Sequence, residues 1–233
     1  LLLDQAASEA LAEAMRSKDV KVKVESVESK PSTRKPAAPF TTSTLQQEAS
    51  RKLRMSAKQT MDTAQSLYQE GHITYMRTDS PVLSTQAIQA ARALAIEMFG
   101  KDSVPDSPRI YTGKSKNAQE AHEAIRPAGE TFLHPSDLPM TMSTRSKDLY
   151  ELIWKRTMAS QMSDAKVSTT TAKISVSPVA DGKSAEFSAS GTVVIFKGFM
   201  AAYEEGRDAS REDEPDEEQE SKLPSLEVGQ ALS

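Results

Sequence analysis

The sequence predicts an α+β fold, in which a mainly helical domain of winged-helix-like order is inserted into a smaller β-rich domain. Apolar residues at helical spacing, together with helix-capping sequences, dominate residues 40–164. Alternating polar and apolar residues, typical of half-buried strands, dominate the C-terminal third of the chain. A proline-rich stretch precedes the helices and marks a boundary. We therefore expect residues 1–39 and 165–233 to form one domain and residues 40–164 to form the other.

The N-terminal elements are expected to be a helix over residues 2–16 and a strand over residues 20–25. Leucine and alanine recur at spacings of three and four in the first segment, and valine alternates with charged residues in the second. Residues 29–39 contain three prolines and no hydrophobic pattern, which predicts a linker or a crossover connection.

Two capping-box sequences, at residues 44–47 and 56–59, predict the next two helices. In such a box a hydroxyl accepts a hydrogen bond from the backbone three residues on, and a glutamine side chain reaches back. We expect helices over 45–54 and 57–70, the second ended by Gly71. Residues 72–78 are rich in β-forming residues and predict a strand.

The remaining elements follow from the same two periodicities. Further helices are expected between Ser84 and Gly100 and over residues 147–162, and a helical turn stopped by Pro127 is expected over residues 118–125. Strands are expected beyond Ala165, in three segments at 169–174, 185–190 and 192–199.

Charge, cysteine content and the length of apolar runs limit the classes of protein to which this chain can belong. The net charge is −4 and ten of the seventeen residues 204–220 are acidic, so we expect a solvated acidic loop there and no strongly basic DNA-binding surface overall. The chain has no cysteine, which excludes thiolate chemistry and cysteine-bound zinc. No run of about 18 apolar residues occurs, which argues against a membrane span. The absence of a starting methionine or leader suggests a segment of a longer protein.

One candidate for chemistry is the pair Tyr75 and Arg77. In an extended segment, residues two apart share a face, so Ile73, Tyr75 and Arg77 are expected side by side. A guanidinium beside a phenol favours the phenolate and can hold a phosphate by paired N–H donors, a combination suited to attack on a phosphodiester. A strand tyrosine near an arginine also occurs in ordinary packing, so the residues alone leave both interpretations open.

The second candidate lies within residues 119–127. On a helix, Gln119, His122 or Glu123, and Arg126 share one face and offer amide, imidazole and guanidinium donors to an anion. The alternative is a solvated helix face with internal charge pairs. Pro127 disfavours helical geometry at Arg126. We expect no metal site in this chain.

Three segments together resemble the bacterial type IA DNA topoisomerases. They are residues 39–47 (PFTTSTLQQ), 73–80 (ITYMRTDS) and 119–127 (QEAHEAIRP). Residues 149–154 and 159–162 extend the resemblance toward the β-region, and the flanking parts match by position only.

The resemblance implies an enzyme whose tyrosine, at the position of Tyr75, cuts single-stranded DNA and keeps the 5′ phosphate covalently bound. It implies strand passage, religation and relaxation of negative supercoils. Arg77 matches the phosphate-contacting arginine of the family, and His122 a histidine beside the scissile bond. Gln119, Glu123, Arg126 and Asp79 are implied only to bind DNA or support the site.

The resemblance also implies partners. Mg²⁺ is expected to bind outside this segment, in a further domain of the same chain, so that the segment alone is expected to be inactive. The expected partner is DNA, chiefly single-stranded, in a cytoplasmic, nucleoid-associated protein, and the two domains are expected to be a β-rich hinge and a tyrosine domain. The competing hypothesis is a non-catalytic winged-helix module that binds DNA and in which Tyr75 only packs.

Overall fold

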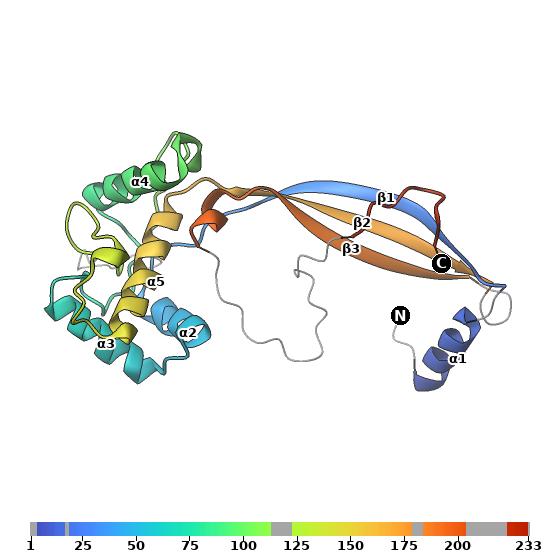
Figure 1. Ribbon diagram of the computed structural model, residues 1–233, viewed down its shortest axis with the longest axis horizontal. Helices are drawn as coiled ribbons and strands as arrows, with labels where there is room; N and C mark the ends of the chain where they lie inside the picture. The colour runs from blue at the N-terminus through green and yellow to red at the C-terminus, as the bar shows by residue number, and fades with distance from the viewer. Residues whose placement is uncertain (1–3, 17–18, 113–122, 179–183, 204–222, 233) are drawn as a thin grey trace. The chain divides into compact units, whose positions relative to one another are not determined.

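The computed structural model describes residues 4–16, 19–112, 123–178, 184–203 and 223–232. The chain divides into two compact units, which are considered one at a time (Figure 1). One contains Arg34–Ala165 and Phe196–Glu212, and we call it the helical unit. The other contains Leu1–Thr33, Lys166–Ile195 and Asp213–Ser233, and we call it the sheet unit.

Local capping begins each long helix of the helical unit. These helices are α2 (Thr42–Leu53), α3 (Ala57–Gln69), α4 (Thr85–Phe99) and α5 (Thr144–Ser160). The hydroxyl before each one accepts a hydrogen bond from the backbone N–H three residues on, which satisfies a donor that the helix itself leaves unpaired. Gly71 and Gly100 follow α3 and α4 with φ of +78° and +83°, the left-handed region that favours glycine.

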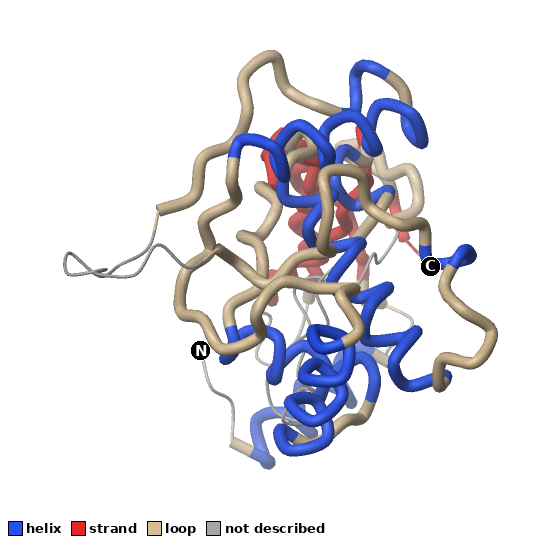
Figure 2. Tube along the Cα trace, turned by 90° about the vertical axis from the view of Figure 1, so that its left-hand side faces the viewer, coloured by secondary structure: helices blue, strands red, loops and turns tan. Residues whose placement is uncertain are grey.

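Helix α5 lies at the centre of the core of the helical unit. Ten of its seventeen residues are buried, and α2, α3 and α4 all pack against it. A helix that is buried on most of its circumference serves as a scaffold for its neighbours. The short 3₁₀ helix η4 (Gly198–Ala201) adds Phe199 to the same core. Tyr203, which follows it, also belongs to this core. Figure 2 shows that long loops, drawn in tan, connect these helices.

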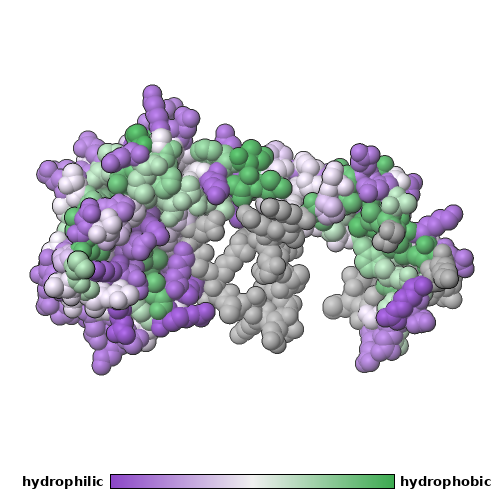
Figure 3. Space-filling view, in the orientation of Figure 1, coloured by the Kyte–Doolittle hydropathy of each residue, from purple (hydrophilic) through white to green (hydrophobic). Residues whose placement is uncertain are grey.

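The sheet unit is built on strands β1 (Lys21–Arg34), β2 (Ala165–Ser177), β3 (Ala185–Phe196) and β4 (Ala231–Leu232), in the order β3-β2-β1-β4. Strands β1 and β4 are antiparallel, with Val22 opposite Leu232. Helix α1 (Gln5–Met15) has no buried residue. Hydrophobic side chains remain exposed on β3, where Val193 and Ile195 are 57% and 65% exposed, and Figure 3 shows hydrophobic patches along this unit.

The mixed helix and sheet class is confirmed, and so are the helices expected over 2–16, 57–70, 84–100 and 147–162, within a few residues. The capping box at 44–47 is wrong. Thr41 caps α2, and Thr44 is the residue whose side chain reaches back, so the helix begins three residues earlier.

The linker expected over 29–39 is also wrong in its first part, because β1 continues through Pro31 to Arg34. Within the residues that the structure describes, β4 pairs with β1 at Val22 and Lys23, far from Pro31. Proline is tolerated in a strand where its missing N–H does not face a neighbouring strand.

Two further expectations fail near the candidate site. Residues 72–78 form an irregular segment, with bends at His72, Thr74 and Met76 and a bridge between Ile73 and Pro127, and no strand. The described end of the expected helix 118–125 is not helical, because Ile125 bridges to Phe40 instead. Near the C-terminus, the strand expected over 192–199 stops at Phe196 and η4 follows.

The expected acidic loop at 204–220 lies outside the described residues. Among the helices that are described, none is both long and apolar enough to cross a lipid bilayer.

Candidate active site

Three stretches that are far apart in the sequence meet in the helical unit. The backbone N–H of Ile125 donates to the carbonyl of Phe40 at 2.8 Å, and Ile73 bridges to Pro127. The residue that follows the cap of α2, Thr42, donates its backbone N–H to the carbonyl of Thr78 at 2.9 Å. The segment containing Tyr75 therefore lies between the start of α2 and the stretch 123–127.

Tyr75 is exposed on this segment. Its side chain is 41% exposed, and its ring packs edge-on against Tyr68 of α3, with ring centroids 5.3 Å apart at 68°. The sequence pattern offers Leu67 or Tyr68 for the buried stripe of α3; Leu67 is buried, whereas Tyr68 is 43% exposed. Tyr68 therefore supports the ring of Tyr75, which remains partly exposed.

Arg77 shares the exposed face with Tyr75. Met76, which lies between them, and Thr78, which follows Arg77, are only 4% and 8% exposed. The expected alternation of exposed and less exposed residues therefore holds from Thr74 onward. Ile73 does not belong to the exposed face, because it is 2% exposed and packs in the core. The arrangement presents a phenol and a guanidinium to solvent from a backbone that is anchored by buried neighbours.

Thr74 anchors the segment on the side of Tyr75. Its hydroxyl donates to the carbonyl of Ala124 at 2.7 Å and accepts from the backbone N–H of Arg126 at 3.0 Å. Its own backbone N–H donates to the carbonyl of Arg126 at 2.9 Å. These three bonds fix the residue before Tyr75 against the third sequence segment. Sequence reasoning missed this role, for which the only local signal is a threonine next to the candidate tyrosine.

Glu123 and Arg126 form an ion pair, with Nη2 of Arg126 2.6 Å from Oε2 of Glu123. The other oxygen of Glu123 accepts from the backbone N–H of Ser84, the cap of α4, at 3.0 Å. Arg126 also donates to the carbonyl of Pro127 at 2.8 Å, and its side chain is only 12% exposed. The pair thus holds the stretch 123–127 against α4, in a geometry that is not the expected helix face.

Buried polar contacts fix helix α2 and the chain segment that leads into it. Arg156 of α5 donates to the carbonyl of Ala38 at 2.7 Å, and its guanidinium lies 4.8 Å from the centre of the Phe40 ring. Buried Glu48 of α2 accepts from the hydroxyl of Tyr203 at 2.7 Å. Because buried charges are costly unless they are paired, these contacts give α2 a defined position.

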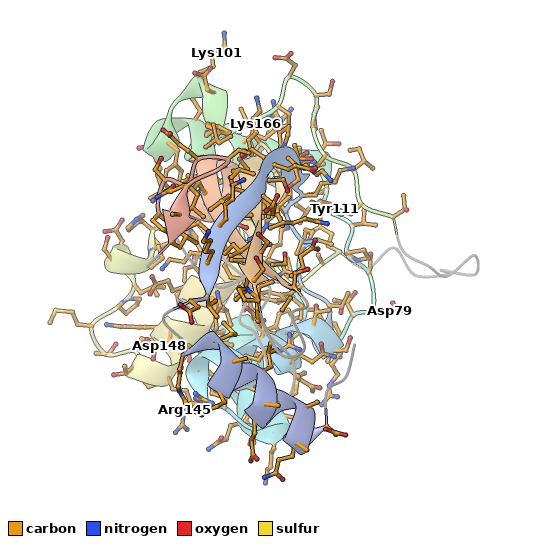
Figure 4. All side chains as sticks on the ribbon, turned by 90° about the vertical axis from the view of Figure 1, so that its right-hand side faces the viewer. Asp79, Lys101, Tyr111, Arg145, Asp148 and Lys166 are labelled. Carbon is orange, nitrogen blue, oxygen red and sulfur yellow. The ribbon has the colours of Figure 1, made fainter. Side chains whose placement is uncertain are left out.

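The remaining predicted residues are less informative. Asp79 is exposed, and in Figure 4 it lies on the opposite side of the helical unit from Asp148 and Arg145 of α5. Gln119 and His122 lie outside the described residues. Over the described ranges, no group of three or more acidic, histidine or cysteine side chains comes together.

A family model described as DNA topoisomerase matches residues 2–233. The chain belongs to the DNA topoisomerase family. Among curated relatives of this family, DNA topoisomerase 1 of Mycolicibacterium smegmatis is 52% identical over 232 residues, and that of Streptomyces coelicolor is 52% identical over 233. Each match covers 100% of this chain and 24% of the relative, so the chain spans about a quarter of the length of these topoisomerases.

A solved structure agrees with this membership. Full-length topoisomerase I of Thermotoga maritima matches with a TM-score of 0.73 and 32% sequence identity, over 99% of this chain and 35% of that one. The resemblance that three short segments indicated is thereby confirmed over nearly the whole chain.

Proposed function

We propose that this chain supplies the nucleophile and a phosphate-binding arginine to the cleavage reaction of a type IA DNA topoisomerase. The observation that carries the proposal is the exposure of Tyr75 and Arg77 on one face of a backbone held from both sides. The membership of the DNA topoisomerase family supports it.

In this reaction the phenolic oxygen of Tyr75 attacks the phosphorus of a single-stranded phosphodiester. The bond from phosphorus to the 3′ oxygen breaks, the phenolic proton is lost, and the 3′ hydroxyl leaves with a proton. The 5′ phosphate stays on the tyrosine until the 3′ hydroxyl attacks it in reverse. Arg77 donates N–H groups to the phosphate oxygens, which carry more negative charge in the transition state than in the ground state.

The other parts of the proposal follow from the family. Strand passage between cleavage and religation relaxes negative supercoils, with the helical unit as tyrosine domain and the sheet unit as hinge. Any Mg²⁺ that the reaction uses is bound outside the described residues, and the chain alone does not relax DNA. DNA, chiefly single-stranded, is the partner, which associates the protein with the nucleoid.

The test is covalent trapping in the full-length protein. Wild type, Tyr75→Phe and Tyr68→Phe are incubated with a labelled single-stranded oligonucleotide and denatured. Tyr68→Phe is the matched control, because Tyr68 is about as exposed as Tyr75 and its ring centroid lies 5.3 Å from that of Tyr75. The change removes a hydroxyl and keeps the ring. We expect an adduct in wild type and Tyr68→Phe and none in Tyr75→Phe. Single-strand binding without any adduct in wild type would instead favour the non-catalytic DNA-binding module.

A further inference from the structure

Thr42 holds the backbone on both sides of Arg77. Its hydroxyl donates to the carbonyl of Met76 at 2.8 Å and accepts from the backbone N–H of Thr78 at 2.9 Å. The backbone N–H of Thr42 also donates to the carbonyl of Thr78 at 2.9 Å. One residue therefore binds the peptide groups immediately before and after Arg77.

These bonds are not needed to begin α2. The cap of α2 is Thr41, whose hydroxyl accepts from the backbone N–H of Thr44, and the hydroxyl of Thr44 closes the box by accepting from the backbone N–H of Thr41 at 2.9 Å. Thr42 is the first residue of the helix, and its hydroxyl contacts the segment of Arg77 instead. The capping role and the clamping role thus fall on different threonines of one turn.

The hydrogen bonds of Thr42 fix the orientation of the backbone around Arg77. Met76 and Thr78 are buried, whereas Arg77 between them is exposed, so the direction of its side chain is set by the backbone rather than by packing. Rotation of the peptide groups that flank Arg77 would redirect its side chain from the exposed face that it shares with Tyr75. A misplacement of about 1 Å in a catalytic group can cost roughly a hundredfold in rate.

We propose that Thr42 is a positioning residue, whose hydroxyl fixes the backbone around Arg77 so that its guanidinium meets the phosphate that Tyr75 attacks. The proposal rests on the proposed function, because it needs Arg77 to act on a phosphate. It adds a residue from a separate helix to the site, and it differs from a purely structural role in a measurable way.

The experiment compares variants of the full-length protein in single-turnover formation of the DNA adduct. Thr42→Val removes the hydroxyl and keeps the shape, and Thr42→Ala removes it with a better helix former. Thr42→Ser keeps the hydroxyl. Thr44→Val is the matched control, because it weakens the capping of the same turn without touching the segment of Arg77. Thermal midpoints are measured for every variant.

We expect Thr42→Val and Thr42→Ala to slow adduct formation by roughly tenfold to a hundredfold, at temperatures well below their midpoints. Thr42→Ser should stay within about threefold of wild type. In the background Arg77→Ala, the change Thr42→Val should have no further effect, because the positioned group is already gone.

Three results would overturn the proposal. They are a wild-type rate in Thr42→Val, an equal loss of rate with and without Arg77, and failure of both Thr42→Val and Thr42→Ala to fold, which would assign the hydroxyl to stability. Tyr75→Phe in the same assay separates this failure from that of the proposed function. An adduct in Tyr75→Phe contradicts the nucleophile, whereas its absence together with a normal rate in Thr42→Val contradicts only the role of Thr42.

Discussion

The hydroxyl of Thr74 lies 2.7 Å from the carbonyl oxygen of Ala124, although fifty positions separate the two residues in the chain. This bond joins the residue before Tyr75 to Ala124, which lies two positions after His122 in the chain. It means that the tyrosine segment is positioned by distant parts of the helical unit and has little regular structure of its own.

Arg77→Ala should slow formation of the DNA adduct by roughly 10² to 10³, the scale of losing one positioned donor to a charged transition state. The thermal midpoint should stay within about two degrees of wild type, because Arg77 is exposed. Single-turnover cleavage and a melting curve measure the two effects. Arg145→Ala is the matched control, since it removes an exposed arginine from α5. Equal effects of the two variants would contradict a specific role for Arg77.

The predictable parts of the fold are those with local signals. Capping hydroxyls and apolar spacing lie within a few residues of each other, which is why α3, α4 and α5 could be predicted from sequence. The β-forming residues 72–78 suit any extended backbone, and whether they form a strand depends on partners elsewhere. The partners that the structure describes for them are Thr42, the stretch 124–127 that binds Thr74, and a single bridge from Ile73.

The candidate site shows the same division. That Tyr75 and Arg77 share one face was predictable, because alternation is local; that this face is exposed, and that Ile73 leaves it, was not. The clamps of Thr42 and Thr74 were not, because each joins residues 34 to 52 positions apart. The ion pair of Glu123 with Arg126 is local, but the bridge at Ile125 prevents the helix that would have placed it on a common face.

Gly198→Ala should destabilise the helical unit. A Cβ at this position would lie 2.5 Å from the carbonyl oxygens of Ser163 and Asp164, and φ is +51°. We expect a loss of at least about 2 kcal/mol, seen as a drop of several degrees in the thermal midpoint. Gly71→Ala is the control with backbone strain alone, because no atom lies within 4 Å of its added Cβ, and it should cost about 1 kcal/mol. Equal losses would show that the close contact is relieved by movement.

Stability should fall as the pH rises above about 10. Burial raises the pKa of Tyr150, and burial with a hydrogen bond to Glu48 raises that of Tyr203. The unfolded state then loses these protons first, so the folded state is penalised from the ordinary tyrosine pKa upward. Denaturant unfolding of Tyr150→Phe at pH 8 and pH 11 should give a smaller difference than wild type. The prediction fails if Tyr150→Phe loses as much stability as wild type over this range.

Deletion of residues 204–220 should leave the thermal midpoint nearly unchanged. The sequence there is dominated by carboxylates and has no apolar periodicity, so it has little surface to bury. Differential scanning calorimetry of the deleted and intact chains is the measurement. A fall of more than several degrees would show that the segment contributes to the fold, since about 1 kcal/mol shifts the midpoint of a chain of this size by only a few degrees.

The central claim is that Tyr75 forms the bond to DNA. The most direct test is mass spectrometry of the adduct trapped between the full-length protein and a single-stranded oligonucleotide, after digestion with a protease and a nuclease. We predict a nucleotide attached to the peptide that contains Tyr75, at the tyrosine oxygen. A nucleotide attached at Tyr68, or to any other residue of the protein, would contradict the account.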